Sequence, residues 1–203
     1  NENRNDDEVF IEAQNHPLRF FMHVGDWGYP DDTDDYPNNS DYFAADYNRV
    51  IQSYKNRYSY RYLSTFLKNV PIDYVWDDHD YGPDDSDRSF YNKHITQKAF
   101  KDFWANKTYG MHPNQNEGVF STFIWGDAQF FLLDDRFFRS PNRRITGEKA
   151  MLGSAQLEWL IDALSSSSSN FKVNTILTIS KSDAKKKVQQ LTGLSSGNEF
   201  TKE

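Results

Sequence analysis

The chain has 203 residues, of which 30 are acidic and 23 are basic, so its formal net charge at neutral pH is -7. This acidity argues against non-specific binding to nucleic acids, whose phosphates carry the same sign of charge. The absence of cysteine excludes disulfide bonds, and no apolar run in the sequence approaches the roughly 20 residues of a membrane-spanning helix.

Two short apolar runs along the chain predict buried strands. Residues 1–17 are polar and charged, and we expect them to form a weakly ordered lead. The first apolar run then extends from Leu18 to Val24, and the second extends from Ile72 to Trp76. Runs of this length that are rich in aromatic and β-branched residues are typical of strands in an α/β sheet.

Each of these runs leads directly into an acidic motif, and together the two motifs indicate a metal site. Ligands in such folds lie beyond the carboxyl ends of the strands, so Asp26 and Asp78 are expected to meet. Two carboxylates about 4 Å apart repel by about 4 kcal/mol at an effective dielectric constant of about 20, so one must be protonated or a cation must bind. Oxygen donors suit Mg²⁺, Ca²⁺, Mn²⁺ and ferric iron, and a phenolate such as that of Tyr29 suits ferric iron. The alternative is that these residues only make polar turns.

Helical spacing dominates the region between the two motifs. The loop that follows the first motif contains four aspartates, at positions 31, 32, 34 and 35, which either bind calcium or form a solvated acidic loop. Apolar residues then recur with helical spacing from Phe43 to Leu67 and predict a long amphipathic helix, with a possible break near Tyr58.

The second half of the chain predicts a helix, a hairpin, another helix and a final strand. Ile95, Ala99, Phe100 and Phe103 share one face of a helix. Gly118–Trp125 and Ala128–Asp134 form a hairpin around Gly126-Asp127. The loop that follows carries five basic residues, which either recognise phosphate or balance surface charge: Arg136, Arg139, Arg143, Arg144 and Lys149. We expect Ser154 to cap the next helix, Phe171–Ile179 to form a strand and residues 180–203 to form a polar tail.

The two acidic motifs resemble those of a known family. The pattern HxGDxxY, followed by a strand and WDDHD, resembles the alkaline phosphatase D (PhoD-like) branch of the calcineurin-like metallophosphoesterases. Further segments are similar to this family in the same order: Val70-Pro71, Phe130–Arg136, Met151–Leu160 and Asn170–Val173. The resemblance implies a calcineurin-like metallophosphoesterase sandwich, an α/β fold with two central β-sheets flanked by helices, here as an incomplete domain.

The resemblance also implies roles for matched residues. Asp26 bridges two metals, Tyr29 binds the ferric ion, Asp78 binds the second metal, and His79 stabilises or protonates the leaving oxygen. The implied cofactor is a dinuclear or multinuclear site that holds Fe³⁺ with Ca²⁺ or another divalent cation, and it lowers the pKa of a bound water to about 7. Arg136 is a candidate for holding phosphate oxygens through its planar fork, and an ion pair with Asp134 or Asp135 is an equal alternative.

Parts of the family's metal site fall outside the matched segment. The family's first ligand motif precedes HxGDxxY, and its last His ligands lie beyond Ile179, where residues 180–203 contain no histidine. We therefore expect a polar lead over residues 1–17, a partial PhoD-like domain over 18–179 and a divergent tail over 180–203. Because the retained motifs are intact, we interpret the sequence as a fragment of a longer protein.

The function implied by the resemblance is metal-dependent hydrolysis of phosphomonoesters or phosphodiesters by metal-activated hydroxide, with this chain carrying part of the site. The implied partner is a small phosphate ester, and the family's location is secreted, periplasmic or at the cell surface. Two alternatives stay open: a catalytically silent scaffold or interaction module, and an acidic calcium-binding domain without chemistry. The oligomeric state and the substrate preference cannot be inferred from the sequence.

Overall fold

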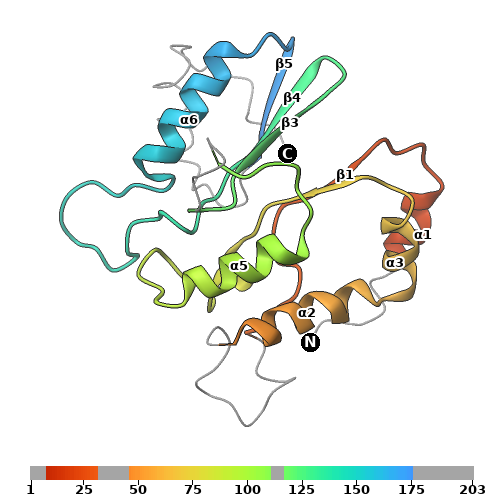
Figure 1. Cartoon of the computed structure of the whole chain (residues 1–203), viewed down its shortest axis with the longest axis horizontal. Coiled ribbons are helices and arrows are strands. Elements are labelled where there is room, and N and C mark those ends of the chain that lie inside the picture. The colour runs from red at the N-terminus through yellow and green to blue at the C-terminus, as the bar shows by residue number, and fades with distance from the viewer. Residues whose placement is uncertain (1–7, 32–45, 111–116, 176–203) are drawn as a thin grey trace, which may run out of the picture.

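The computed structural model describes residues 8–31, 46–110 and 117–175, and in these residues two small sheets are surrounded by helices (Figure 1). The strands form one two-stranded and one three-stranded sheet. In chain order the elements are α1 Val9–Gln14, β1 Phe21–His23, α2 Tyr47–Tyr58, α3 Arg61–Leu67, β2 Ile72–Tyr74, α4 Asp78–Tyr81, α5 Lys93–Phe103, β3 Ser121–Trp125, β4 Ala128–Leu132, α6 Gly153–Ser166 and β5 Phe171–Thr175.

The first sheet confirms the two strands predicted before the acidic motifs. Strands β1 and β2 are parallel, with Phe21 opposite Ile72 and His23 opposite Tyr74. Both strands are shorter than the apolar runs that predict them, and Leu18 at the start of the first run is 43% exposed. Because the strands are parallel and in register, the chain leaves both of them at the same edge of the sheet.

An aromatic core packs the helices against this sheet. Trp104 at the end of α5 stacks on Tyr74 of β2 with ring centroids 3.6 Å apart, and Tyr54 of α2 lies 5.4 Å from the same indole. Helices α2 and α5 therefore lie side by side (Figure 1). Burial of aromatic area of this kind is the main favourable contribution to the stability of such a fold.

The helical region between the strands is divided in two. Helix α2 ends at Tyr58 and α3 begins at Arg61, so the predicted break is present. Helix α2 begins after Asp46, whose side chain accepts a hydrogen bond from the backbone N–H of Asn48 at 2.8 Å and caps the helix. The predicted helical residues 43–45 lie outside the described residues.

The expectation of a weakly ordered lead is wrong for Val9–Gln14, which form helix α1. The ring of Phe10 lies 5.4 Å from that of Phe66 on α3 and 6.3 Å from that of Phe21 on β1. The polar composition of residues 1–17 hides the apolar residues Phe10 and Ala13, which both pack against the core. A single aromatic residue that contacts two other elements is enough to position a short helix that would be unstable alone.

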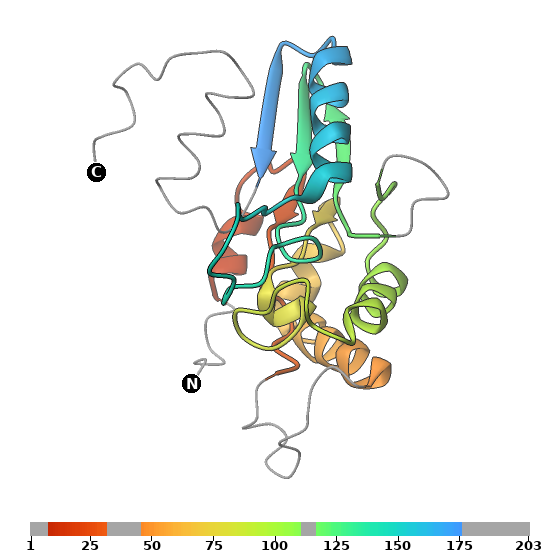
Figure 2. The ribbon, with the colours of Figure 1, turned by 90° about the vertical axis from the view of Figure 1, so that its left-hand side faces the viewer.

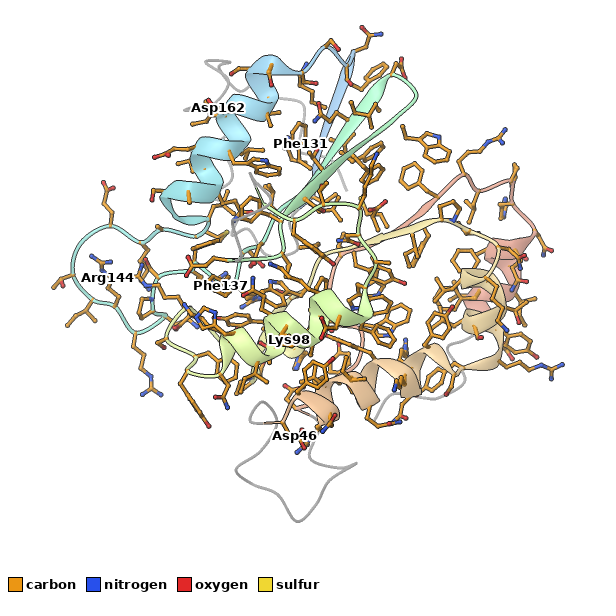
Figure 3. All side chains as sticks on the ribbon, in the orientation of Figure 1. Asp46, Lys98, Phe131, Phe137, Arg144 and Asp162 are labelled. Carbon is orange, nitrogen blue, oxygen red and sulfur yellow. The ribbon has the colours of Figure 1, made fainter. Side chains whose placement is uncertain are left out.

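The second sheet contains the predicted hairpin. Strands β3 and β4 are antiparallel, and β5 is parallel to β4, so the strand order is β3-β4-β5. Helix α6 runs along this sheet (Figure 2), where its Trp159 lies 4.8 Å from the ring of Phe120 and 6.2 Å from that of Phe131. Phe131, labelled in Figure 3, fills the space between the sheet and α6 and is 0% exposed.

The predicted cap at Ser154 is wrong, because α6 begins one residue earlier at Gly153 and its N-cap is Leu152. Gly153 has a φ of +71°, and a Cβ atom there would lie 2.8 Å from Cβ of Phe138. The start of α6 is instead tied to the end of β4 by Gln156, whose side chain accepts from the backbone N–H of Asp134 and donates to its carbonyl. Gly153 therefore allows close packing against Phe138, and Gln156 supplies the hydrogen bonds between α6 and Asp134.

The final predicted strand is present as β5, and its last four predicted residues, 176–179, lie outside the described residues, as does the predicted tail. Among the helices that the structure describes, none combines the length and the apolar character needed to cross a lipid bilayer.

Candidate metal centre

The loops that follow β1 and β2 touch each other, and Gly25 makes this approach possible. Gly25 has a φ of +113°, in the region that favours glycine. A Cβ atom at this position would lie 2.5 Å from Cβ of Asp77 and 2.6 Å from its backbone nitrogen. Any larger residue would push the two loops apart, so the glycine of the first motif is needed for close packing.

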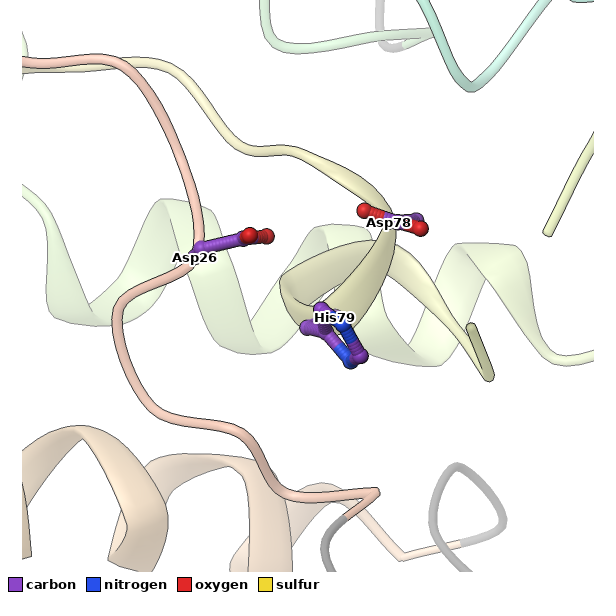
Figure 4. A group of neighbouring side chains, drawn as sticks. All are labelled: Asp26, Asp78 and His79. Atoms are coloured by element: carbon purple, nitrogen blue, oxygen red, sulfur yellow. The ribbon is translucent and has the colours of Figure 1, made fainter. Parts of the chain in front are cut away.

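Three predicted site residues lie together at this contact. One ligand atom from each of Asp26, Asp78 and His79 lies within 4.8 Å of the others. Figure 4 shows the Asp26 side chain extending from the loop after β1 toward Asp78 and His79, which belong to the short helix α4. The predicted convergence of the two acidic motifs is therefore present in the structure.

Asp26 has an unusual backbone and an unsatisfied side-chain oxygen. Its φ of 60° lies in the left-handed region, which non-glycine residues seldom adopt. Oδ2 accepts a hydrogen bond from the hydroxyl of Tyr29 at 3.2 Å, whereas Oδ1 is buried without a hydrogen-bond partner among the described residues. Burial raises the pKa of Asp26, the charge of Asp78 adds to the rise, and His79 opposes it.

Asp78 has a lowered pKa, whereas the pKa of Asp26 is raised. Burial would raise its pKa, but a hydrogen bond from the backbone N–H of Asp85 at 2.8 Å and the nearby charge of Arg136 hold the pKa below its ordinary value. Nη2 of Arg136 lies 3.5 Å from Oδ1 of Asp78. At neutral pH Asp78 is therefore a stable carboxylate, and it lies beside a second carboxylate whose ionisation is costly.

His79 is oriented by a carboxylate from the first loop. Its Nδ1 lies 2.6 Å from Oδ2 of Asp31, and its Nε2 lies 3.8 Å from Oδ1 of Asp84. Burial lowers the pKa of His79, but the hydrogen bond and the charge of Asp31, together with Asp26, outweigh it and raise the pKa above 6.5. The ring of Tyr29 lies against the imidazole, with centroids 4.5 Å apart.

The sequence does not identify Asp31 as the partner of His79, because there Asp31 is one of four aspartates in a loop that is either solvated or calcium-binding. The other three aspartates of that group lie outside the described residues. A second group of carboxylates within reach of one another consists of Asp78, Asp84 and Asp85, of which the last two are exposed.

Arg136 lies in the interior rather than on the basic loop. Its side chain is 2% exposed, and Nε donates a hydrogen bond to Oδ1 of Asp77 at 2.5 Å. The predicted pairing with Asp135 is present at 3.7 Å, and Nη1 approaches the carbonyl of Ser86 at 3.5 Å. The guanidinium thus joins the turn after β4 to the loop after β2 and supplies positive charge beside Asp78.

Of the remaining basic residues, Arg139 is partly buried, whereas Arg143, Arg144 and Lys149 are exposed on a loop, labelled at Arg144 in Figure 3. The Nε of Arg144 donates a hydrogen bond to the carbonyl of Thr146 within this loop. The base of this loop is fixed by Asn142, which donates from its backbone N–H to Asp87 and from its side chain to the carbonyl of Asp85. The loop that carries Arg143, Arg144 and Lys149 therefore borders the loop after α4 that carries Asp85 and Asp87.

Two further polar residues of the motifs lie inside the protein, His23 partly buried and Asp80 fully buried. His23 accepts a hydrogen bond at Nδ1 from the backbone N–H of Gly25 at 3.3 Å, and burial lowers its pKa to about 4, so it is a neutral core residue. Asp80 is 1% exposed. Burial raises its pKa to about 7, the charge of Asp26 adds to the rise, and backbone N–H donors oppose it. The Asp-x-x-Asp spacing from Asp77 to Asp80 is a capping-box signal that could have identified Asp80 in the sequence.

The donors at the centre fit hard metal ions. They are carboxylates and a phenol, which ferric iron and oxygen-seeking divalent ions prefer, and an imidazole, which suits iron. The decisive observation is Oδ1 of Asp26, a buried acceptor without a hydrogen-bond partner in the described part of the chain. Such an atom is costly to bury unless a cation or a proton satisfies it.

Comparison with known proteins agrees with this fold. Residues 7–198 match the model of a family described as PhoD-like phosphatase. A solved structure described as PhoD is 18% identical and superposes with a TM-score of 0.64 over 83% of this chain, which confirms the expected α/β fold. That match covers 38% of the PhoD chain, so this chain spans about two-fifths of its length. None of the curated proteins compared with the chain matches it. Because the family model spans most of its residues, the chain belongs to the PhoD-like phosphatase family.

Proposed function

We propose that the protein hydrolyses phosphate esters at a metal centre to which this chain contributes Asp26, Tyr29 and Asp78. The observation that carries the proposal is the buried, unpartnered Oδ1 of Asp26, which lies beside the carboxylate of Asp78. A site that only made polar turns has no reason to bury a carboxylate oxygen without a donor.

The donor set supports Fe³⁺ together with Ca²⁺ or another divalent cation. Tyr29 would supply a phenolate to the ferric ion, Asp26 would bridge two ions with its two oxygens, and Asp78 would bind the second ion. Such ions supply Lewis acidity that activates water and neutralises phosphate charge.

His79 is proposed to act as the general acid for the leaving group. Its Nδ1 is held by Asp31, so the proton to be transferred is on Nε2, the nitrogen that lies 3.8 Å from the exposed Asp84. The raised pKa favours retention of this proton, as a general acid requires. The hydrogen bond to Asp31 fixes the ring while the proton leaves.

Arg136 is proposed to hold phosphate oxygens, as the resemblance implies. Its fork already pairs with Asp77 and lies 3.5 Å from Asp78, so a phosphate contact requires that the guanidinium also reach the metal centre.

The substrate is a small phosphate ester. Export to the periplasm or cell surface stays a prediction.

Metal content and hydrolysis of an aryl phosphate ester, measured on the complete gene product, test the proposed function. We expect iron together with calcium or another divalent ion in the purified protein, and a loss of turnover when a chelator removes them, because the carboxylates cannot activate water alone. Restoration by added metal is the control for denaturation. A folded protein that takes up no transition metal and hydrolyses no ester would instead be a silent relative.

Replacing Asp31 by asparagine is expected to lower the pKa of His79. The change keeps the shape of the side chain but removes the charge and the acceptor that raise this pKa. A lower pKa means that His79 loses its proton at a lower pH, so the alkaline limb of the pH–rate profile should move toward acid. NMR titration of the His79 ring measures the pKa directly. The control is Asp84→Asn, because Asp84 is 77% exposed at the side chain and lies 3.8 Å away, and it should shift the limb less.

A further inference from the structure

We infer that Asp80 is a positioning residue that sets the separation between the two metal-bearing loops. The inference rests on the proposed function, because it takes Asp26 and Asp78 as metal ligands. It gives Asp80, the last acidic residue of WDDHD, a role other than binding metal. Asp80 is 1% exposed and belongs to the same short helix, α4, as Asp78 and His79.

The carboxylate of Asp80 accepts hydrogen bonds from three backbone N–H groups on two loops. Oδ2 accepts from Asp26 at 2.6 Å and from Asp77 at 3.3 Å, and Oδ1 accepts from Trp27 at 3.1 Å. Two of the three donors thus belong to the loop after β1, which is 53 and 54 residues away along the chain. One buried side chain therefore holds backbone donors of both loops against α4.

A simple helix cap does not account for these contacts. A capping box requires only the hydrogen bond between Asp80 and the backbone of Asp77. The bonds to Asp26 and Trp27 instead fix a piece of chain in which Asp26 has a φ of 60°. Holding this backbone fixes the direction of the Asp26 side chain, and anchoring it to α4 fixes its separation from Asp78.

Asp134 offers a matched comparison within the same chain. It is 0% exposed and also accepts three backbone N–H groups, from Val119 on one oxygen and from Arg136 and Phe137 on the other. Val119 lies just before β3, and Arg136 and Phe137 lie in the turn after β4. Asp134→Asn therefore removes the same kind of interaction as Asp80→Asn without loosening the loop after β1.

The test compares Asp80→Asn with Asp134→Asn in the complete gene product. An asparagine presents one oxygen and one NH₂ group, so it cannot accept from all three donors. We expect amide hydrogen exchange at Asp26 and Trp27 to become at least about tenfold faster in Asp80→Asn than in Asp134→Asn. We also expect Mn²⁺, used as the probe ion, to bind roughly 10- to 100-fold more weakly to Asp80→Asn, as is found when groups that orient metal ligands are removed.

A second variant, Asp80→Glu, keeps both oxygens but displaces them by one methylene group, and it should still weaken Mn²⁺ binding. The inference is overturned if exchange at these amides is the same in Asp80→Asn and Asp134→Asn, or if Asp80→Glu binds Mn²⁺ as tightly as wild type. If the wild-type protein binds no metal, the proposed function fails, whereas the exchange comparison still decides whether Asp80 holds the two loops.

Discussion

Replacing Asp26 by asparagine is expected to lower kcat/KM for an aryl phosphate ester by roughly a thousandfold or more. The change removes the charge of a carboxylate that has one oxygen buried without a hydrogen-bond partner among the described residues and that we propose bridges two cations. A bound ion contributes several kcal/mol of transition-state stabilisation, and each 1.36 kcal/mol corresponds to about a factor of ten in rate. Metal analysis of the purified variant should show the same loss as the activity assay.

A matched control for this variant is Asp73→Asn. Asp73 is a partly buried carboxylate on β2, and burial raises its pKa as burial raises that of Asp26, but it is not among the residues grouped at the metal centre. Its replacement should leave metal content and turnover close to wild type. Equal loss of activity in both variants would instead indicate that any change in this sheet disturbs the fold.

Asp26→Asn should also make the metal-free protein more stable, although it lowers the activity. Because burial raises the pKa of Asp26, the folded protein holds this proton more tightly than the unfolded chain. The free energy of unfolding therefore falls as pH rises from the unfolded pKa to the folded pKa and stays lowered at neutral pH. Asparagine removes this cost, so the variant should unfold at a higher temperature than wild type at neutral pH.

The sequence predicted the elements that carry the metal centre because their signals are local. The apolar runs before Asp26 and Asp78 mark strand ends, and parallel pairing of β1 with β2 brings such ends to one edge of a sheet. The break near Tyr58 and the hairpin at Gly126-Asp127 are also marked locally, by helical spacing and by turn residues.

The contacts that organise the centre could not be predicted in the same way, because each joins residues far apart in the chain. Asp31 and His79 are 48 positions apart, and nothing in an acidic loop distinguishes the one aspartate that meets the imidazole. Phe10 fixes helix α1 through rings on two other elements. Ser154 is a residue type that favours a cap, but α6 begins at Gly153, and Gln156 ties the helix to the residues after β4.

Arg136 shows how burial changes the interpretation of a charged residue. In the sequence it is the first of several basic residues in a loop and a candidate for binding phosphate. In the structure it is 2% exposed, whereas Arg143, Arg144 and Lys149 are exposed. A buried guanidinium that pairs with Asp77 neutralises charge inside the protein, and this contribution is distinct from any contact with substrate.

Replacing Arg136 by methionine is therefore expected to lower the free energy of unfolding by about 3–5 kcal/mol, because it leaves the buried carboxylate of Asp77 without its cation. Denaturant unfolding of the metal-free protein measures this loss. Asp77→Asn in the same background should recover part of it, since the uncompensated charge is then absent.

The control for this prediction is Arg139→Met, which should cost less than about 1 kcal/mol. The side chain of Arg139 is 24% exposed, and its Nη1 lies 3.9 Å from Asp135, so that pair is long and partly screened. If Arg136 acted on substrate alone, its replacement would raise KM and leave the unfolding curve where it was. A loss of both stability and substrate affinity would show that Arg136 stabilises the fold and also binds substrate. Its guanidinium pairs with Asp77 and lies 3.5 Å from Asp78, so both roles are compatible with its position.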